Sequence, residues 1–82
     1  MDIIETSIFS RQVQALLSDD DYRKLQITLI LHPDSGAIIP GSGGLRKVRW
    51  AIQGRGKRGG VRDIYDWMDA RNKILMLLMY AK

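Results

Sequence analysis

Residues 43–62 read GGLRKVRWAIQGRGKRGGVR, and the rest of the chain can be arranged around this stretch. It contains no acid and holds seven of the 13 basic residues, namely Arg46, Lys47, Arg49, Arg55, Lys57, Arg58 and Arg62. The other residues carry six bases against nine acids, so the net charge of +4 comes from this one region. Positive charge interleaved with glycine, Trp50 and Gln53 is typical of a surface that binds a polyanion, most often nucleic acid.

Residue alternation in and after this stretch predicts three strands joined as a meander. The predicted elements are a strand in residues 45–52, a glycine-rich hairpin loop at 53–60, a strand at 61–68, a tight turn at 69–72 and a strand at 73–80. The last run is almost continuously apolar, which predicts a strand covered on both faces and central in its sheet. Strict alternation puts Lys47 and Arg49 on one face and Arg46 on the other.

Two amphipathic helices are predicted before the meander. Phe9, Val13, Leu16 and Leu17 recur at helical spacing behind an N-cap at Thr6 or Ser7. Ser18 then restarts the pattern with Asp21 three residues later, which resembles a capping box. The buried stripe of the second helix is predicted to be Tyr22, Leu25, Leu29 and Ile30, and the helix should end at His32-Pro33.

These elements, with a short β-capable segment at residues 2–5 and a loop at residues 34–44, predict one α+β domain over residues 1–82. Its two N-terminal helices should pack on a small, mainly antiparallel sheet. Eighty-two residues without cysteine, signal peptide or a long apolar run predict a soluble, cytoplasmic protein with no membrane partner. No metal site or cofactor is predicted.

The basic residues of the strands are the sharpest candidate site. An antiparallel partner carrying Arg62 would bring a third cation to Lys47 and Arg49, and such a cluster is favourable mainly where an anion fills it. A solvated basic strand face is the alternative. If RNA is cleaved, its own 2′-OH is the nucleophile, arginines would stabilise the phosphorane, and a lysine or Tyr80 would carry the proton.

The glycine loop formally matches G-x-G-x-x-G between Gly54 and Gly59. A strand and not a helix is predicted after it, which argues against dinucleotide binding, and 82 residues cannot hold the other kinase motifs. The loop is therefore either a plain hairpin or a loop that closes on a phosphate backbone. Trp50 and Trp67 either stack on bases or fill the core, and His32 is expected to cap a helix end.

The segments GGLRKVRWAIQGRGKRGGVR, LHPDSGAIIPGSGG and LLMYAK together resemble the RelE/HigB toxins of bacterial toxin–antitoxin modules, with the HigB branch the most similar. This resemblance implies a β-α-α-β-β-β fold and a ribosome-dependent mRNA endonuclease, or mRNA interferase, that inhibits translation. It implies cleavage by 2′-OH attack, with mRNA, the ribosome and an antitoxin protein as partners.

Carried over to this sequence, the resemblance implies catalytic roles for Lys47, Arg49, Arg62 and Tyr80. It implies RNA-binding roles for residues in the glycine loop, beside the first strand and at the chain end: Arg46, Arg55, Lys57, Arg58 and Lys82.

Two departures from the family pattern matter for function. The sequence stops at Lys82, where relatives continue into a C-terminal helix, so self-association or capture of a partner by the uncovered sheet is expected. Asp63 and Asp66 stand in a strand where relatives usually have apolar and aromatic residues. One hypothesis is a truncated or engineered variant, in which carboxylates cover exposed apolar surface and Asp66 neutralises the RNA site.

Two other functions stay open at this point. A non-catalytic scaffold of this fold would bind RNA, the ribosome or a protein without cutting. A ParE-type toxin would inhibit gyrase, which requires no cationic RNA site, and the dense basic cluster argues against it.

Overall fold

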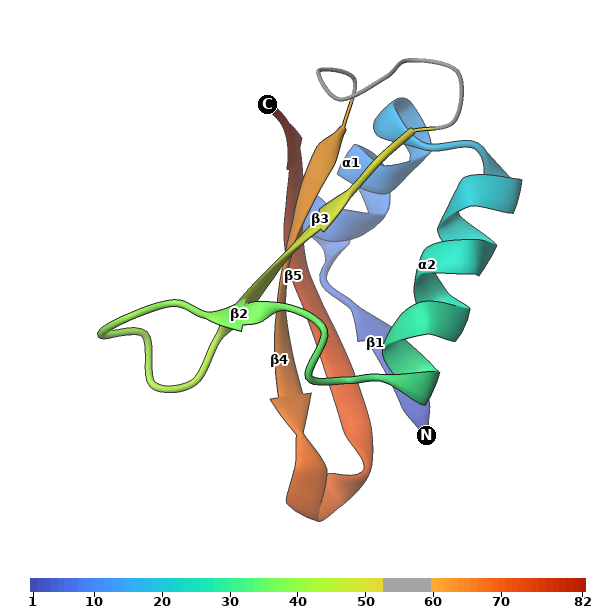
Figure 1. Ribbon diagram of the computed structural model, residues 1–82. Helices are drawn as coiled ribbons and strands as arrows, with labels where there is room; N and C mark the ends of the chain where they lie inside the picture. The colour runs from blue at the N-terminus through green and yellow to red at the C-terminus, as the bar shows by residue number, and fades with distance from the viewer. Residues whose placement is uncertain (53–59) are drawn as a thin grey trace.

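The computed structural model describes residues 1–52 and 60–82, which form two helices and one five-stranded sheet. The elements in chain order are β1 (Asp2–Glu5), α1 (Ser7–Leu16), α2 (Asp19–Leu31), β2 (Ala37–Ile38), β3 (Arg46–Trp50), β4 (Val61–Met68), the 3-10 turn η2 (Asp69–Arg71) and β5 (Lys73–Ala81). Both helices lie on the same side of the sheet (Figure 1). The α+β architecture predicted from the sequence is confirmed.

The helices begin and end where their capping residues predicted. The Thr6 hydroxyl accepts a hydrogen bond from the Phe9 N–H at 3.0 Å, and the Ser18 hydroxyl accepts one from the Asp21 N–H at 3.1 Å. At the other end of α2, the backbone N–H of His32 donates to the Thr28 carbonyl at 2.8 Å. Each bond satisfies a main-chain group that helix termination leaves without an intrahelical partner.

The strand order is β1-β5-β4-β3-β2, with β1 parallel to β5 and the other neighbours antiparallel. The middle strand is thus β4, while β5 is an interior strand beside it. The segment expected to be a loop at residues 34–44 contains β2, in which Ala37 and Ile38 pair with Lys47 and Arg46. The prediction missed this strand because two residues give no alternation to read; their pairing satisfies main-chain groups of β3.

A β-bulge interrupts the pairing of β4 with β5. Ile64 pairs with Leu78 and Tyr65 pairs with Met76, which leaves Leu77 as the additional residue. The Thr6 hydroxyl donates to the Leu77 carbonyl at 2.7 Å while it accepts from Phe9. One side chain therefore caps α1 and satisfies the main chain at the bulge.

The core lies between the helices and the sheet. Its buried members are Phe9, Val13, Leu17, Leu25, Leu29, Val48, Val61, Tyr65, Ile74, Met76 and Met79. The prediction that β5 is covered on both faces is wrong, because Leu78 and Tyr80 on its other face are 39% and 41% exposed. Ile30, which was assigned to the buried stripe of α2, is also exposed, because it lies on a different side of the helix from the buried residues Leu25 and Leu29.

Candidate nucleic-acid interface

The sheet face opposite the helices, called the open face below, carries Lys47, Arg49, Arg62, Ile64, Leu78 and Tyr80. Arg49 pairs with Arg62 and Arg62 pairs with Tyr80, which makes one row across β3, β4 and β5. Lys47 stands in the next row on this face, beside Ile64. Directly paired residues project to the same side of a sheet, so the four predicted catalytic residues share one face.

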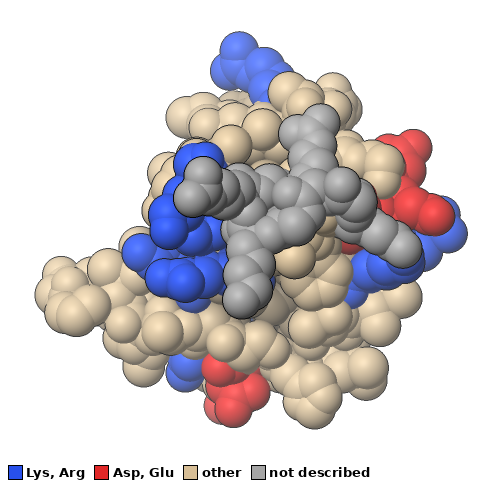
Figure 2. All heavy atoms as spheres, turned by 45° about the horizontal axis from the view of Figure 1, so that its top comes forward, with Lys and Arg blue, Asp and Glu red and all other residues tan. Residues whose placement is uncertain are grey.

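The electrostatics of this row favour an anion. The β-carbons of directly opposed strand residues lie about 5 Å apart, so the Arg49 and Arg62 side chains start as close neighbours. Arg49 is exposed, whereas Arg62 is 9% exposed and its Nη1 donates to the Val61 carbonyl at 3.4 Å. Like charges at directly opposed strand positions repel, and an anion bound between them would reduce that cost. Figure 2 shows several Lys and Arg side chains gathered on one part of the molecular surface.

The other predicted RNA-binding residues are distributed differently. Lys82 follows Tyr80 by two residues and is exposed, and its backbone N–H donates to the Gly60 carbonyl at 3.4 Å. Arg55, Lys57 and Arg58, with most of the predicted hairpin loop, lie outside the described residues.

Arg46 stands on the helix side of the sheet, apart from the open face. Its guanidinium lies over the Trp67 ring at 5.7 Å from the centroid, and its Nη1 donates to the Gly36 carbonyl at 2.8 Å. These contacts hold the segment before β2 against the sheet. Arg46 therefore serves the fold in this structure, and its guanidinium is engaged away from the basic row.

The two aspartates of β4 project to opposite sides. Asp66 pairs with Leu75 and lies on the same side as Arg62, two pleats along the strand. Asp63 is fully buried on the helix side of the sheet, between Val48 and Met79, and neither of its carboxyl oxygens has a hydrogen-bond partner within residues 1–52 and 60–82. Burial raises the pKa of Asp63 to about 7. The hypothesis that both carboxylates cover exposed apolar surface is therefore wrong for Asp63.

Sequence reasoning missed the part that Tyr65 plays. Its hydroxyl donates to the Pro33 carbonyl at 2.7 Å and accepts from the buried Gly36 N–H at 2.9 Å. A β-carbon at position 36 would stand 2.9 Å from the Tyr65 ring and 3.0 Å from the Lys47 carbonyl oxygen, so Gly36 fits this approach without a side chain. No local pattern signals a contact between residues so far apart in the chain.

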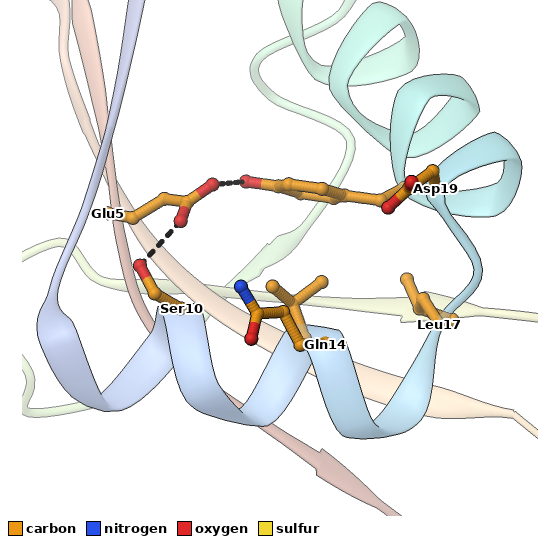
Figure 3. Close-up of a pocket in the computed structure, with 7 residues that line it drawn as sticks. Glu5, Ser10, Gln14, Leu17 and Asp19 are labelled. Atoms are coloured by element: carbon orange, nitrogen blue, oxygen red, sulfur yellow. Dashed lines mark hydrogen bonds between the residues drawn. The ribbon is translucent and has the colours of Figure 1, made fainter.

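A pocket of about 180 Å³ lies on the helix side, between β1, α1 and the start of α2 (Figure 3). The Glu5 carboxylate accepts hydrogen bonds there from the Ser10 hydroxyl at 2.6 Å and the Tyr22 hydroxyl at 2.5 Å. Burial, followed by the bond to Glu5, raises the pKa of Tyr22 far above its ordinary value. With Glu5 and Asp19 in its wall, the pocket is unsuited to a phosphate.

The two tryptophans have structural roles in the described residues. Trp50 and Trp67 are partly buried against the core, which supports the core interpretation of both rings.

In residues 1–52 and 60–82 no three His, Cys, Asp or Glu side chains are grouped to hold a metal ion. Over the same residues, neither helix has the length and apolar character needed to cross a bilayer.

A scan against models of known protein families finds no family whose model matches this chain.

Proposed function

We propose that this chain binds RNA on the open face and acts as a ribosome-dependent mRNA endonuclease, similar to the RelE/HigB toxins. The observation that carries the proposal is the row Arg49–Arg62–Tyr80, with Lys47 in the next row of the same face. A phosphodiester between the two guanidinium groups would receive charge-assisted hydrogen bonds, which arginine makes with fork geometry.

The chemistry would use the nucleophile that RNA contains. The 2′-oxygen attacks the adjacent phosphorus as its proton passes to a base, and the bond to the 5′-oxygen of the next nucleotide breaks as that oxygen takes a proton. The products are a 2′,3′-cyclic phosphate and a free 5′-hydroxyl. Arg49 and Arg62 would stabilise the charge on the pentavalent phosphorus, and Lys47 and Tyr80 are the candidate proton carriers.

A second candidate is a non-catalytic scaffold that binds RNA, the ribosome or an antitoxin. The observation that favours it is Asp66, which projects to the same side of β4 as Arg62 and would oppose RNA phosphates. The two candidates predict the same binding surface and differ in whether the phosphodiester is cut.

Cleavage of mRNA on programmed ribosomes, mapped at nucleotide resolution, tests the proposal. The wild-type chain is expected to give cuts within codons at the decoding site, and Lys47→Ala and Arg49→Ala should each reduce the rate at least tenfold. Arg11→Ala, which removes an exposed arginine from α1, is the matched control and should cut at the wild-type rate.

Each other outcome has a clear meaning. Ribosome binding that Arg49→Ala weakens, without cleavage by the wild-type chain, would support the scaffold. Absence of cleavage, of ribosome binding and of RNA binding would reject the endonuclease and any scaffold that binds RNA or the ribosome. Gyrase inhibition in their place would support the ParE-type alternative.

A further inference from the structure

The outer edge of β1 is the longer of the two free edges that the described residues leave on the sheet. β1 pairs with β5 on one side only. The Asp2 N–H donates to the Asn72 carbonyl at 3.2 Å and the Thr6 N–H donates to the Met76 carbonyl at 3.1 Å. In a parallel ladder the residues that bond a given neighbour alternate, so Ile4 also bonds toward β5. The N–H and C=O groups of Ile3 and Glu5 therefore point outward.

Apolar side chains flank this edge. A groove of about 630 Å³ runs between β1 and α2 and is lined by Met1, Asp2, Ile3, Ile4, Arg23, Gln26, Ile27 and Ile30. Ile4, Ile27 and Ile30 are 40%, 50% and 42% exposed. β1 has no proline, lysine or bulge, which are three of the devices that protect an edge strand from pairing with another chain. It does carry two acids, Asp2 and Glu5, and the Glu5 carboxylate is already engaged by the Ser10 and Tyr22 hydroxyls. The opposite edge, β2, has two residues and is soon followed by Pro40.

We propose that two copies of this chain associate through antiparallel pairing of their β1 strands, about a two-fold axis that passes through Ile4. The hydrogen-bond pattern requires the axis to pass through a residue, and Ile4 is the position that keeps every bond between the two copies within β1. Outward-facing residues must meet outward-facing residues, and centring on Ile4 opposes Ile3 of each copy to Glu5 of the other. All four outward main-chain groups of each β1 then have partners within the strand.

The side chains are compatible with this register. Ile4 of one copy faces Ile4 of the second copy, Asp2 faces Thr6, and no two carboxylates stand directly opposite each other. Pairing centred on Glu5 would oppose two carboxylates, which is unfavourable. Sliding one strand by a single residue would move the axis to a point between two residues. Outward groups would then lie opposite inward ones, and no hydrogen bonds would form between the strands.

The pairing produces a continuous sheet through both copies. A two-fold axis perpendicular to the sheet keeps both open faces on one side and all four helices on the other. Ile4 and Leu75, which are paired within one copy, would form an apolar row across the junction with their equivalents. This inference goes beyond the proposed function and does not depend on it, since no residue of the basic row takes part.

Sedimentation analysis of charge-swapped variants tests the register. The wild-type chain should associate to a dimer as its concentration rises to about millimolar. Ile4→Lys and Ile4→Glu should each remain monomeric, because they oppose like charges across the axis, and their equimolar mixture should regain the dimer. Ile8→Lys alters an exposed isoleucine of α1 outside the groove and should dimerise like the wild type.

Three results would overturn the proposal: a wild-type monomer throughout that concentration range, a mixture that stays monomeric, or an equal loss of dimer in Ile8→Lys. Far-UV circular dichroism of each variant confirms that a monomer is a folded one. Capture of a different protein's strand in place of a second copy would give the first of these results.

A cross-link gives an independent readout because the chain contains no cysteine. Ile4 opposite Ile4 is a non-hydrogen-bonded antiparallel pair, whose α-carbons lie about 4.5 Å apart, within the range of a disulfide. Ile4→Cys should give a covalent dimer on mild oxidation, whereas Ile8→Cys should give little. Equal cross-linking of the two variants would exclude the register centred on Ile4.

Discussion

Arg49 on β3 is paired directly with Arg62 on β4, and both side chains stand on the face that the helices leave uncovered. The next residue pair, Val48 and Asp63, projects to the opposite side, where Asp63 is buried. The carboxylate next to Arg62 in the chain is thus directed into the core and away from the two guanidinium groups. Strand alternation separates the charges, which leaves the arginine pair suited to an external anion.

Replacing Arg49 tests whether this pair binds phosphate. Arg49→Ala should weaken binding of a short single-stranded RNA and lower the slope of log K against log salt by about 0.7 for each phosphate that is no longer neutralised. Its folding stability should be unchanged or higher by a few tenths of a kcal/mol, roughly, because a like-charge pair is removed. Fluorescence anisotropy at several salt concentrations measures the binding. An unchanged slope, or an equal effect of Arg11→Ala, would count against the site.

Removing the acid that lies two pleats from Arg62 on the same side of β4 should have the opposite effect. Asp66→Asn keeps the size of the side chain and removes its negative charge, so RNA affinity should rise severalfold at low salt and less at high salt. Asp69→Asn, in the exposed turn η2, is the matched control and should change affinity less. Equal gains in both variants would indicate a general charge effect and would argue against a role for Asp66 at the site.

Asp63 should make folding stability depend on pH. Because its pKa rises from an ordinary 3.8 to about 7 in the folded state, the folded chain holds this proton more tightly than the unfolded chain. Ionisation of Asp63 therefore destabilises the folded chain. This destabilisation is absent below about pH 4, grows as the pH rises, and is complete above about pH 7. The full destabilisation corresponds to about 4 kcal/mol.

Urea unfolding of Asp63→Val between pH 4 and pH 8 measures this effect. The variant should be increasingly more stable than the wild type as the pH rises, and their difference should level off above pH 7. Asp63→Asn keeps a buried polar group but cannot titrate, so its stability should lack this pH-dependent component. Parallel pH profiles of wild type and Asp63→Val would contradict the prediction.

The contacts of Tyr65 with the segment before β2 predict a cost on removing one oxygen. Tyr65→Phe leaves the buried Gly36 N–H and the Pro33 carbonyl without this partner, so the free energy of unfolding should fall by about 1–3 kcal/mol. Tyr80→Phe removes the hydroxyl of an exposed tyrosine and should change stability little. Urea unfolding of both variants measures the two changes in free energy of unfolding. An equal decrease in both variants would mean that the two hydrogen bonds of Tyr65 contribute no net stability.

Part of the candidate site could be predicted from the sequence. Alternation predicted that Lys47 and Arg49 share a face, and the register places Arg62 and Tyr80 in the same row. The contacts of Arg46 and the burial of Arg62 and Asp63 could not be predicted in this way. Arg46 contacts Gly36 and Trp67, and the near-burial of Arg62 and the burial of Asp63 depend on what packs on each side of β4.

The sequence by itself determined the helix ends and the alternation of each long strand, because these arise from interactions over a few residues. Thr6 and Ser18 each bond a backbone group three positions along the chain. Only the tertiary structure decided the parallel direction of β1, the strand β2, the bulge at Leu77 and the side of the sheet that the helices cover. These features depend on contacts such as Thr6 with Leu77, 71 residues apart, and Tyr65 with Pro33, 32 apart, which no local pattern encodes.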